Sequence, residues 1–296
     1  MGILVAMAYP TSLFANQADH TYVKCSTGGK AWGCWGGKSG GKELRRATGS
    51  TKRGDCIARP DEKANIKCYL INGVCHQAAN RILLPAGITV RGARGYSISE
   101  ALFGTYGRVG IWPCSSPFNK CGTTTGDLSG CGIAALTATS AAVARTEAEQ
   151  FDWVYINSVL KLYAKAPGIQ TQLRSVRAGR APVASSIAKA ETFHVALFAN
   201  MAEYKLGPLL DRNLERKLLT IRRDTERKRI QLERQRAAGE ISDEEFVSKF
   251  DGITIEFQDK MASALKPAEY VTLFDAKPDE RFVLSDKTIV KKEFGI

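Results

Sequence analysis

The sequence predicts an α+β protein in which a cysteine- and glycine-rich amino-terminal part is followed by a helical hairpin or bundle. Three observations lead to this prediction. All eight cysteines fall within the first 131 residues. Glycine-rich stretches such as "CSTGGKAWGCWGGKSGGK", which begins at Cys25, lie in the same part and are typical of hairpin tips and loops. From about Ile133 the sequence becomes alanine-rich and then charged, with apolar residues at helical spacing.

Length and composition fit a folded protein of one or two domains. The chain has 296 residues, of which 44% are hydrophobic, and this argues against a disordered chain. The change in texture near Ile133 divides it into a cysteine-rich domain, residues 19–132, and a mainly helical domain, residues 133–296. The net charge of +12 favours anionic partners such as nucleic acid, lipid headgroups or cell-wall polymers, although a total charge does not define a binding patch.

The first 18 residues have some features of a secretion signal. "MGILVAMAYPTSLFANQADH" contains an apolar run that ends in small residues, and Leu13 and Ala15 are suitably placed before a cleavage point. A basic start is missing, and the run is too short and too interrupted by Pro10 to span a membrane. Two interpretations stay open: a signal-like segment over residues 1–18, or a buried first strand.

The cysteines indicate the cellular environment. They lie at positions 25, 34, 56, 68, 75, 114, 121 and 131, and no two have the C-x-x-C spacing of a structural zinc site. Their density favours disulfide bonds in an oxidising compartment, so we expect a secreted or periplasmic protein, with reduced thiols in the cytoplasm as the alternative. The bridges expected first are Cys25 to Cys34 and Cys56 to Cys68, because each closes a short loop. The glycines match neither a phosphate-binding loop nor a dinucleotide fingerprint, so no metal or other cofactor is expected.

Two long helical stretches are expected in the carboxy-terminal half. Residues 134–166 are alanine-rich and then charged, and Pro167 and Gly168 end this stretch. A second stretch covers residues 184–238, with an interruption near Gly207 and Pro208.

The second stretch contains an apolar stripe and ends at a helix-stop signal. The stripe has three- and four-residue spacing and consists of Leu210, Leu214, Leu218 and Ile221. "RAAGEISDEEF" then supplies Gly239 as a helix stop, and Ser242 with Glu245 as a capping box for the next helix. These signals predict an αα-hairpin whose stripe packs on its own domain or on a second copy of the chain.

The segment from Arg212 to Arg236 is strongly basic. It contains ten Lys or Arg and four Asp or Glu, which leaves a net charge of +6. One face could therefore bind a polyanion, which makes an anionic partner one prediction. Because the acids are interspersed among the bases, we favour a solvated helix with ion pairs at i,i+4 spacing.

The segment "INGVCHQAANRILLP", residues 71–85, contains the main candidate for chemistry. Asn72 and Gly73 form a turn, and Cys75 then falls in the first turn of a short helix. The inward face of this helix is expected to consist of Ala78, Ala79, Ile82 and Leu83. At a helix start, unpaired backbone N–H groups and the helix dipole stabilise a thiolate. Cys75 is therefore a candidate nucleophile, while a disulfide or a simply buried thiol stay open as alternatives.

A nucleophilic cysteine also needs an imidazole within hydrogen-bond reach, and the chain has three histidines. His76 is adjacent to Cys75 and is expected to point to another side of the helix. His20 opens "HTYVKC", a short alternating strand, and His194 lies in "ETFHVALFAN", which fits either a strand or part of a helix.

A strand that begins His-Thr, followed by a helix that begins with Cys, resembles the circularly permuted papain-fold cysteine hydrolases, the deSUMOylating-peptidase and lecithin:retinol acyltransferase-like groups. The resemblance covers residues 19–24 and 69–84, with "YLINGVC" before the helix and Asn80 five residues after the cysteine. It implies a papain-like domain in which Cys75 is the nucleophile and His20 the base. Val74 replaces the usual Asn before the cysteine, and an alanine replaces the aromatic residue within the helix.

Several supporting roles follow from this arrangement. The backbone N–H of Cys75 could donate one hydrogen bond to an oxyanion, and Gln77 or Asn80 another. Asp19 or Asn80 could orient the histidine. The ordinary papain-like order, with the cysteine first, would instead pair Cys75 with His194, since "FHVALF" resembles the histidine-bearing strand of cell-wall cysteine peptidases. We favour His20, because the surroundings of His194 are helical.

Two functions are therefore predicted. The first is a cysteine-dependent hydrolase or acyltransferase that acts on an amide or ester bond of a peptide, cell-wall or acyl substrate. The second is a non-catalytic, secreted, disulfide-rich binding module with a basic helical arm. The reactivity of the Cys75 thiol in the native protein distinguishes them.

Overall fold

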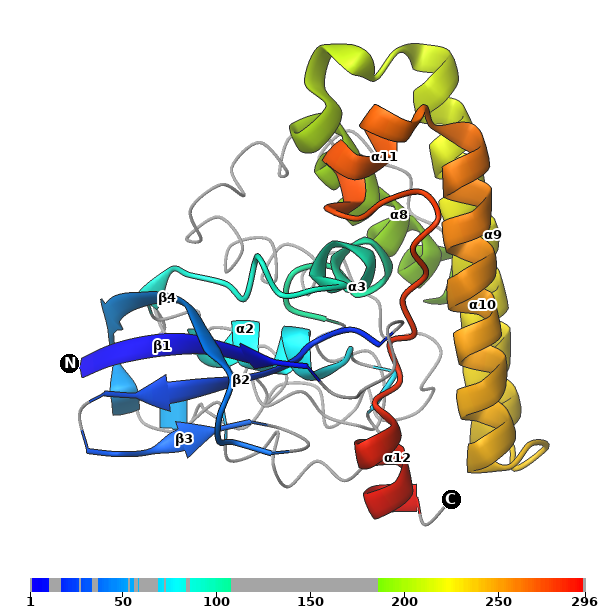
Figure 1. Ribbon diagram of the computed structural model, residues 1–296. Helices are drawn as coiled ribbons and strands as arrows, with labels where there is room; N and C mark the ends of the chain where they lie inside the picture. The colour runs from blue at the N-terminus through cyan, green and yellow to red at the C-terminus, as the bar shows by residue number, and fades with distance from the viewer. Residues whose placement is uncertain are drawn as a thin grey trace.

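The structure, a computed structural model, is α+β (Figure 1). It describes residues 2–10, 17–26, 28–33, 37–52, 54–55, 58, 69–71, 73–83, 86–107 and 186–294. The described part contains a four-stranded antiparallel sheet and a helical carboxy-terminal region, which confirms the coarse prediction. The predicted helical stretch 134–166 and the cysteines other than Cys25 and Cys75 lie outside the described residues, so the disulfide pairs stay predictions.

The sheet is formed by the first fifty residues. Its strand order is β3-β2-β1-β4, and the strands are β1 (Gly2–Tyr9), β2 (His20–Cys25), β3 (Ala31–Trp32) and β4 (Lys42–Gly49). β1 pairs antiparallel with β2 on one side and with β4 on the other. The apolar run with signal-like features is thus a central strand, and Leu4, Ala6 and Ala8 on it are fully buried. β2 is buried on both faces rather than alternating, because a helix covers it.

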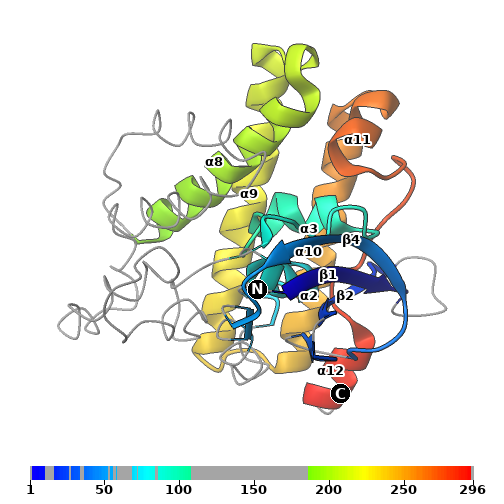
Figure 2. The same ribbon diagram turned by 90° about the vertical axis from the view of Figure 1, so that its left-hand side faces the viewer.

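Two short helices connect the sheet to the rest of the molecule. Helix α2 (Cys75–Leu83) packs on β1 and β2, and helix α3 (Tyr96–Phe103) packs on the other side of α2 (Figures 1 and 2). Every residue of α2 is buried, including the four expected to face inward. The prediction of a short helix that begins at Cys75 is confirmed.

The carboxy-terminal region consists of five helices and a 3₁₀ turn. They are α8 (Ser186–Leu206), η5 (Gly207–Leu209), α9 (Arg212–Ala237), α10 (Asp243–Ala264), α11 (Pro267–Phe274) and α12 (Lys287–Phe294). Helices α9 and α10 lie side by side as a long hairpin (Figure 1), and α8 packs against α9, α3 and α11.

The helix boundaries follow the predicted signals. The break at Gly207 and Pro208 forms η5. Gly239 has φ 73°, a conformation that favours glycine after a helix. Ser242 is the N-cap of α10, and its hydroxyl accepts a hydrogen bond from the backbone N–H of Glu245 at 3.1 Å. The predicted αα-hairpin is confirmed.

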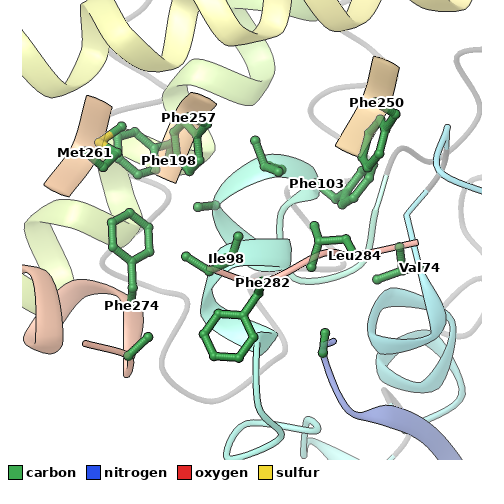
Figure 3. Close-up of a cluster of buried hydrophobic side chains, with 14 of the residues drawn as sticks. Val74, Ile98, Phe103, Phe198, Phe250, Phe257, Met261, Phe274, Phe282 and Leu284 are labelled. Carbon is green, nitrogen blue, oxygen red and sulfur yellow. The ribbon is translucent and has the colours of Figure 1, made fainter. Parts of the chain in front are cut away.

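One large hydrophobic cluster joins the two halves of the chain (Figure 3). The rings of Phe103 and Phe250 stack with their centroids 5.9 Å apart, so α3 is packed directly on α10. Leu218 of the predicted stripe is fully buried, and the other stripe residues are partly buried against the same cluster. The stripe therefore packs on the core of its own chain. This agrees with the first of the two predicted alternatives, packing on its own domain or on a second copy.

The basic helix α9 differs from the predicted solvated helix. Four of its charged residues are buried, with exposures between 0% and 4%, and together they form a ladder of ion pairs: Arg222, Glu226, Arg229 and Glu233. A guanidinium nitrogen of Arg222 lies 2.8 Å from the Glu226 carboxylate, Arg229 lies 3.1 Å from the same carboxylate, and Arg229 lies 3.5 Å from Glu233. The i,i+4 pairs were predicted correctly, but this arginine ladder lies inside the protein.

The arginines of the ladder are buried because they donate hydrogen bonds to the last carbonyl groups of α3. The last carbonyl groups of a helix have no partner within that helix. Arg222 donates hydrogen bonds to the carbonyls of Ala101 and Leu102, both at 2.8 Å, and Arg229 donates to Leu102 at 2.7 Å. Helix α9 is therefore anchored on α3, which in turn supports α2.

Candidate active site

Cys75 is placed by a tight turn at the start of α2. Gly73 has φ 129°, and a Cβ at this position would lie 2.7 Å from the Cβ of Gln77, so the turn requires glycine. The backbone N–H of Val74 donates to the side-chain oxygen of Gln77 at 3.1 Å. Gln77 thus closes the turn and fixes the direction in which α2 leaves it.

Cys75 is a free cysteine with 6% exposure. Its thiol donates a weak hydrogen bond to the carbonyl of Asp19 at 3.7 Å. The N–H groups of Gln77 and Ala78 bond to the carbonyl of Val74, at 3.1 and 3.2 Å. The first two N–H groups of α2, those of Cys75 and His76, have no acceptor within the helix. They are the natural donors to an anion that forms beside the sulfur.

His20 lies against Cys75 from the first position of β2. It is opposite Tyr9 in the β1–β2 register, and the two ring centroids are 4.9 Å apart. Its side chain is fully buried. Burial lowers the pKa of His20, but the charge of Cys75 and the carboxylate of Asp286 raise it more, so that the pKa lies at about 9 instead of 6.5. The imidazolium is thus favoured when the Cys75 sulfur carries a charge.

Asp286 approaches His20 from the far end of the chain. Its Oδ2 lies 3.5 Å from Nδ1 of His20. Its Oδ1 accepts hydrogen bonds from the backbone N–H groups of Thr288 and Ile289, at 2.8 and 3.2 Å, and so caps the start of α12. The backbone N–H of Asp286 donates to the hydroxyl of Tyr69 at 2.6 Å. These contacts fix the carboxylate beside the imidazole.

Cys75, His20 and Asp286 together form a cluster that we call the thiol site. A sulfur, an imidazole and a carboxylate in contact order are the groups of a nucleophile, a base and an orienting acid. Neither ring nitrogen of His20 makes a well-aligned hydrogen bond to a described residue, so the contact with Asp286 is a charge pair at the outer limit of hydrogen-bond distance. Long contacts of this kind are common in ligand-free active sites.

Asn80 is not part of the thiol site. Its amide donates to the hydroxyl of Tyr96 at 3.2 Å and to the carbonyl of Thr105 at 2.7 Å, and its oxygen accepts from the N–H of Val90 at 2.8 Å. These bonds use both donors of the amide and engage its oxygen, so Asn80 holds α2 to α3 and the following loop. The side chain that approaches the His20 ring is that of Asp286 and not that of Asn80.

Gln77 is likewise engaged elsewhere. Its amide donates to the hydroxyl of Ser99 and to the carbonyl of Gly104, both at 3.2 Å. Since these two bonds use both N–H groups of the amide, the side chain has no donor left for an oxyanion. Both predicted side-chain oxyanion donors, Gln77 and Asn80, are therefore structural.

Asp19 and the other two histidines occupy separate positions. The carboxylate of Asp19 accepts from the backbone N–H of Arg94 at 3.0 Å, so it does not orient His20. The ring of His76 lies 2.8 Å from the hydroxyl of Ser99 and 2.9 Å from the carbonyl of Asp19, and burial lowers its pKa to about 4. His194 is buried within α8. Among the described residues, the imidazole that lies against Cys75 is that of His20.

Asp286 was missed by sequence reasoning. The only local signal is "SDKT", in which Asp286 stands where an N-cap precedes a helix. That pattern predicts a cap but not contact with a histidine at position 20. In the described part of the chain, no group of three or more His, Cys, Asp or Glu is arranged to hold a metal ion.

Three comparisons with known proteins found no match to the chain. Protein-family models, curated proteins and solved structures were all searched, and none matches it. None of the described helices combines the length and apolar character that a membrane span requires.

Proposed function

We propose that the chain is a cysteine-dependent hydrolase or acyltransferase of papain-like type, acting on an amide or ester bond. The observation that carries the proposal is that His20 interacts with Cys75 and that Asp286 lies 3.5 Å from Nδ1 of the same imidazole. The strand with the histidine precedes the helix with the cysteine, as in the permuted papain-fold families. A peptide, cell-wall or acyl substrate fits this chemistry.

In the first step, the Cys75 sulfur, whose proton has passed to His20, attacks the carbonyl carbon of the substrate as a thiolate and forms the carbon–sulfur bond. The carbonyl oxygen becomes an oxyanion, which the N–H groups of Cys75 and His76 stabilise at the positive end of α2. The tetrahedral intermediate then breaks its bond to the amine or alcohol, and the imidazolium of His20 gives its proton to this leaving group. The product of the step is a thioester on Cys75.

In the second step, water or an acceptor alcohol or amine attacks the thioester. Neutral His20 takes the proton of the attacking group, and the sulfur leaves as thiolate. Asp286 stabilises the imidazolium that forms again and keeps its ring in one orientation. Hydrolysis and acyl transfer differ only in the acceptor.

The test uses the full chain under native, non-reducing conditions. Cys75 should react rapidly with iodoacetamide, and the protein should release nitrophenol from an activated nitrophenyl ester. His20→Ala should lower ester cleavage by about 10² to 10⁴, whereas His194→Ala should leave it near the level of the unaltered protein once both variants are shown to fold. Cys75→Ala should abolish cleavage.

Cys25 provides a matched control for Cys75. It is buried to a similar degree, with 4% exposure, and lies at the opposite end of β2 from His20. Cys25→Ala should leave ester cleavage unchanged. Mass mapping that found Cys75 joined to another cysteine in the native protein would remove the proposal, and a requirement for His194 instead of His20 would replace the permuted order by the ordinary one.

A further inference from the structure

The segment that carries Asp286 is held by helix α10. This segment, residues 282–286, runs from α11 towards α12 (Figure 1). The backbone N–H of Phe282 donates to the side-chain oxygen of Gln258 at 2.8 Å, and the amide of Gln258 donates to the carbonyl of Phe282 at 2.9 Å. This paired bond fixes the first residue of the segment on the hairpin.

The opposite side of the segment contacts residues that precede and follow β2 in the chain. Ala18 donates its backbone N–H to the carbonyl of Val283 at 3.2 Å. Gln17 donates to the carbonyl of Ser285 at 3.4 Å, and the hydroxyl of Tyr69 donates to the carbonyl of Leu284 at 3.3 Å. The segment is therefore clamped between the helical hairpin and the part of the chain that bears the thiol site.

Asp251 of α10 reaches the residue next to Asp286. The hydroxyl of Ser285 donates a short hydrogen bond to Oδ2 of Asp251. The other oxygen, Oδ1, is buried and has no hydrogen-bond partner among the described residues. A half-satisfied buried carboxylate is costly for stability, so this position is not explained by stability alone.

The pKa of Asp251 reflects the burial of its carboxylate. Burial raises its pKa to about 6, although the hydroxyl and backbone N–H of Ser285 and the charge of Lys287 act in the opposite direction. At neutral pH the carboxylate is still mostly ionised, and it accepts from Ser285 as the geometry requires.

We propose that Asp251 is a positioning residue of the thiol site, which holds Ser285 and thereby fixes the adjacent Asp286 carboxylate against His20. The inference rests on the proposed function and extends the site into the helical hairpin. Loss of this hold lets Asp286 move away from an imidazole that is already 3.5 Å distant. A misplacement of about 1 Å in an active site can cost up to about 10² in rate, so we expect an effect of about tenfold.

Two variants of Asp251 isolate the hydrogen bond from the charge. Asp251→Asn and Asp251→Ala both remove the negative charge, but only the Asn variant keeps an oxygen that accepts from Ser285. Ser285→Ala removes the hydroxyl that donates to Asp251, and so breaks the same hydrogen bond. The double variant Asp251→Ala with Ser285→Ala should be no worse than Asp251→Ala alone, because Asp251→Ala already removes the bond to the Ser285 hydroxyl.

The readouts are the NMR titration of the His20 ring in the full chain and the rate at which iodoacetamide modifies Cys75. Three histidines make the titration tractable, and His76, with its pKa of about 4, does not titrate in the same range as His20. Asp251→Ala and Ser285→Ala should each lower the pKa of His20 and slow the modification of Cys75 by about tenfold. Asp251→Asn should restore both values nearly to those of the unaltered protein.

The outcomes separate this inference from the proposed function. If the unaltered protein has an ordinary His20 pKa and a slowly reacting Cys75, the proposed function is wrong. If the unaltered protein behaves as proposed but Asp251→Ala and Ser285→Ala do not change it, Asp251 is not a positioning residue. An equal loss in Asp251→Asn and Asp251→Ala would mean that the charge acts, and would also overturn the inference. If Asp251→Ala does not fold, Ser285→Ala decides the question.

Discussion

The thiol site and the arginine ladder are two buried polar clusters that differ in how many hydrogen bonds their side chains make. Both join the amino-terminal half of the chain to the helical half, and both contain residues with almost no exposure. In the ladder, Arg222 and Arg229 donate to two carboxylates and to the backbone of α3 at 2.7 to 3.5 Å. In the thiol site, the ring of His20 has no well-aligned hydrogen bond to a described residue.

The difference distinguishes a structural from a chemical use of buried charge. A buried polar network stabilises a unique packing only when its groups are bonded, since each unsatisfied group costs about 1 to 3 kcal/mol. Most of the contacts described for the ladder are bonds of this kind. In the proposed function, the thiol site keeps bonding capacity for a reacting group, and the surrounding structure must compensate for its cost. Substitutions in the ladder should therefore mainly lower the stability of the fold, whereas substitutions in the thiol site should mainly lower the reactivity of Cys75.

The largest loss of stability is expected from Glu226→Gln in the ladder. Its carboxylate lies between Arg222 and Arg229, and all three side chains are fully buried. Removal of one partner from a buried ion pair leaves the other charge uncompensated, so the free energy of unfolding should fall by about 3 to 5 kcal/mol. Urea denaturation measures this change.

Glu240→Gln is the matched control, because Glu240 is an exposed residue just after α9. It should change the free energy of unfolding by less than about 0.5 kcal/mol. In the folded fraction of Glu226→Gln, Cys75 should still react with iodoacetamide at nearly the normal rate. Equal stabilities of the two variants would show that the ladder does not stabilise the fold.

A moderate loss of stability is expected from Gly73→Ala, next to the thiol site. A Cβ there would meet Gln77 at 2.7 Å and would need φ 129°, which side-chain-bearing residues avoid. The free energy of unfolding should fall by about 1 to 3 kcal/mol, and ester cleavage should fall with it because the turn positions Cys75. Gly252→Ala in α10, where no atom lies within 4 Å, should instead stabilise the protein by about 0.5 to 1 kcal/mol. A neutral Gly73→Ala would contradict the described turn.

The last substitution is Cys75→Ala. Its main effect should be on His20, since the charge of Cys75 is the largest influence that raises the pKa of this ring. Without that charge, burial still lowers the pKa of His20 and only Asp286 raises it. The pKa of His20 measured by NMR should therefore fall well below 9. A pKa that stays at about 9 would show that Cys75 does not interact with His20.

The same titration gives a pH dependence of stability with a defined sign. The pKa of His20 is raised in the folded protein, so protonation of this ring stabilises the fold. The contribution is fully present below pH 6.5, the ordinary pKa, and is lost as pH rises through about 9. Urea denaturation across this range should show a decrease in the unaltered protein that Cys75→Ala largely lacks. Ester cleavage should also fall above about pH 9, where His20 no longer carries the proton for the leaving group.

Sequence patterns predicted the elements whose signals are local. Gly239 and Ser242 mark the end of α9 and the start of α10 because caps depend on neighbouring backbone groups. Cys75 at the start of α2 and His20 at the start of β2 were placed for the same reason. Contact between these two residues was inferred from a resemblance, and the structure brings them together.

Long-range contacts were not predictable in this way. Asp286 is 217 residues from the Tyr69 hydroxyl that holds it, and no local pattern encodes that distance. The burial of Arg222 and Arg229 was missed because a basic helix normally faces water, whereas here the carbonyls of another helix need donors. Asn80 was misassigned because its position in the family pattern does not reveal which groups its amide bonds.

The position of Asp286 in the chain also matters while the protein is being made. A ribosome that adds 5 to 20 residues per second needs about 10 to 40 s for the roughly 200 residues between Cys75 and Asp286. Throughout that time, the nascent chain has the sulfur and the imidazole but lacks the carboxylate that aligns them. A chain interrupted before Asp286, or clipped there by a protease, is in the same state. Under the proposed function, full reactivity of the thiol therefore requires a chain that has been translated through Asp286 and folded.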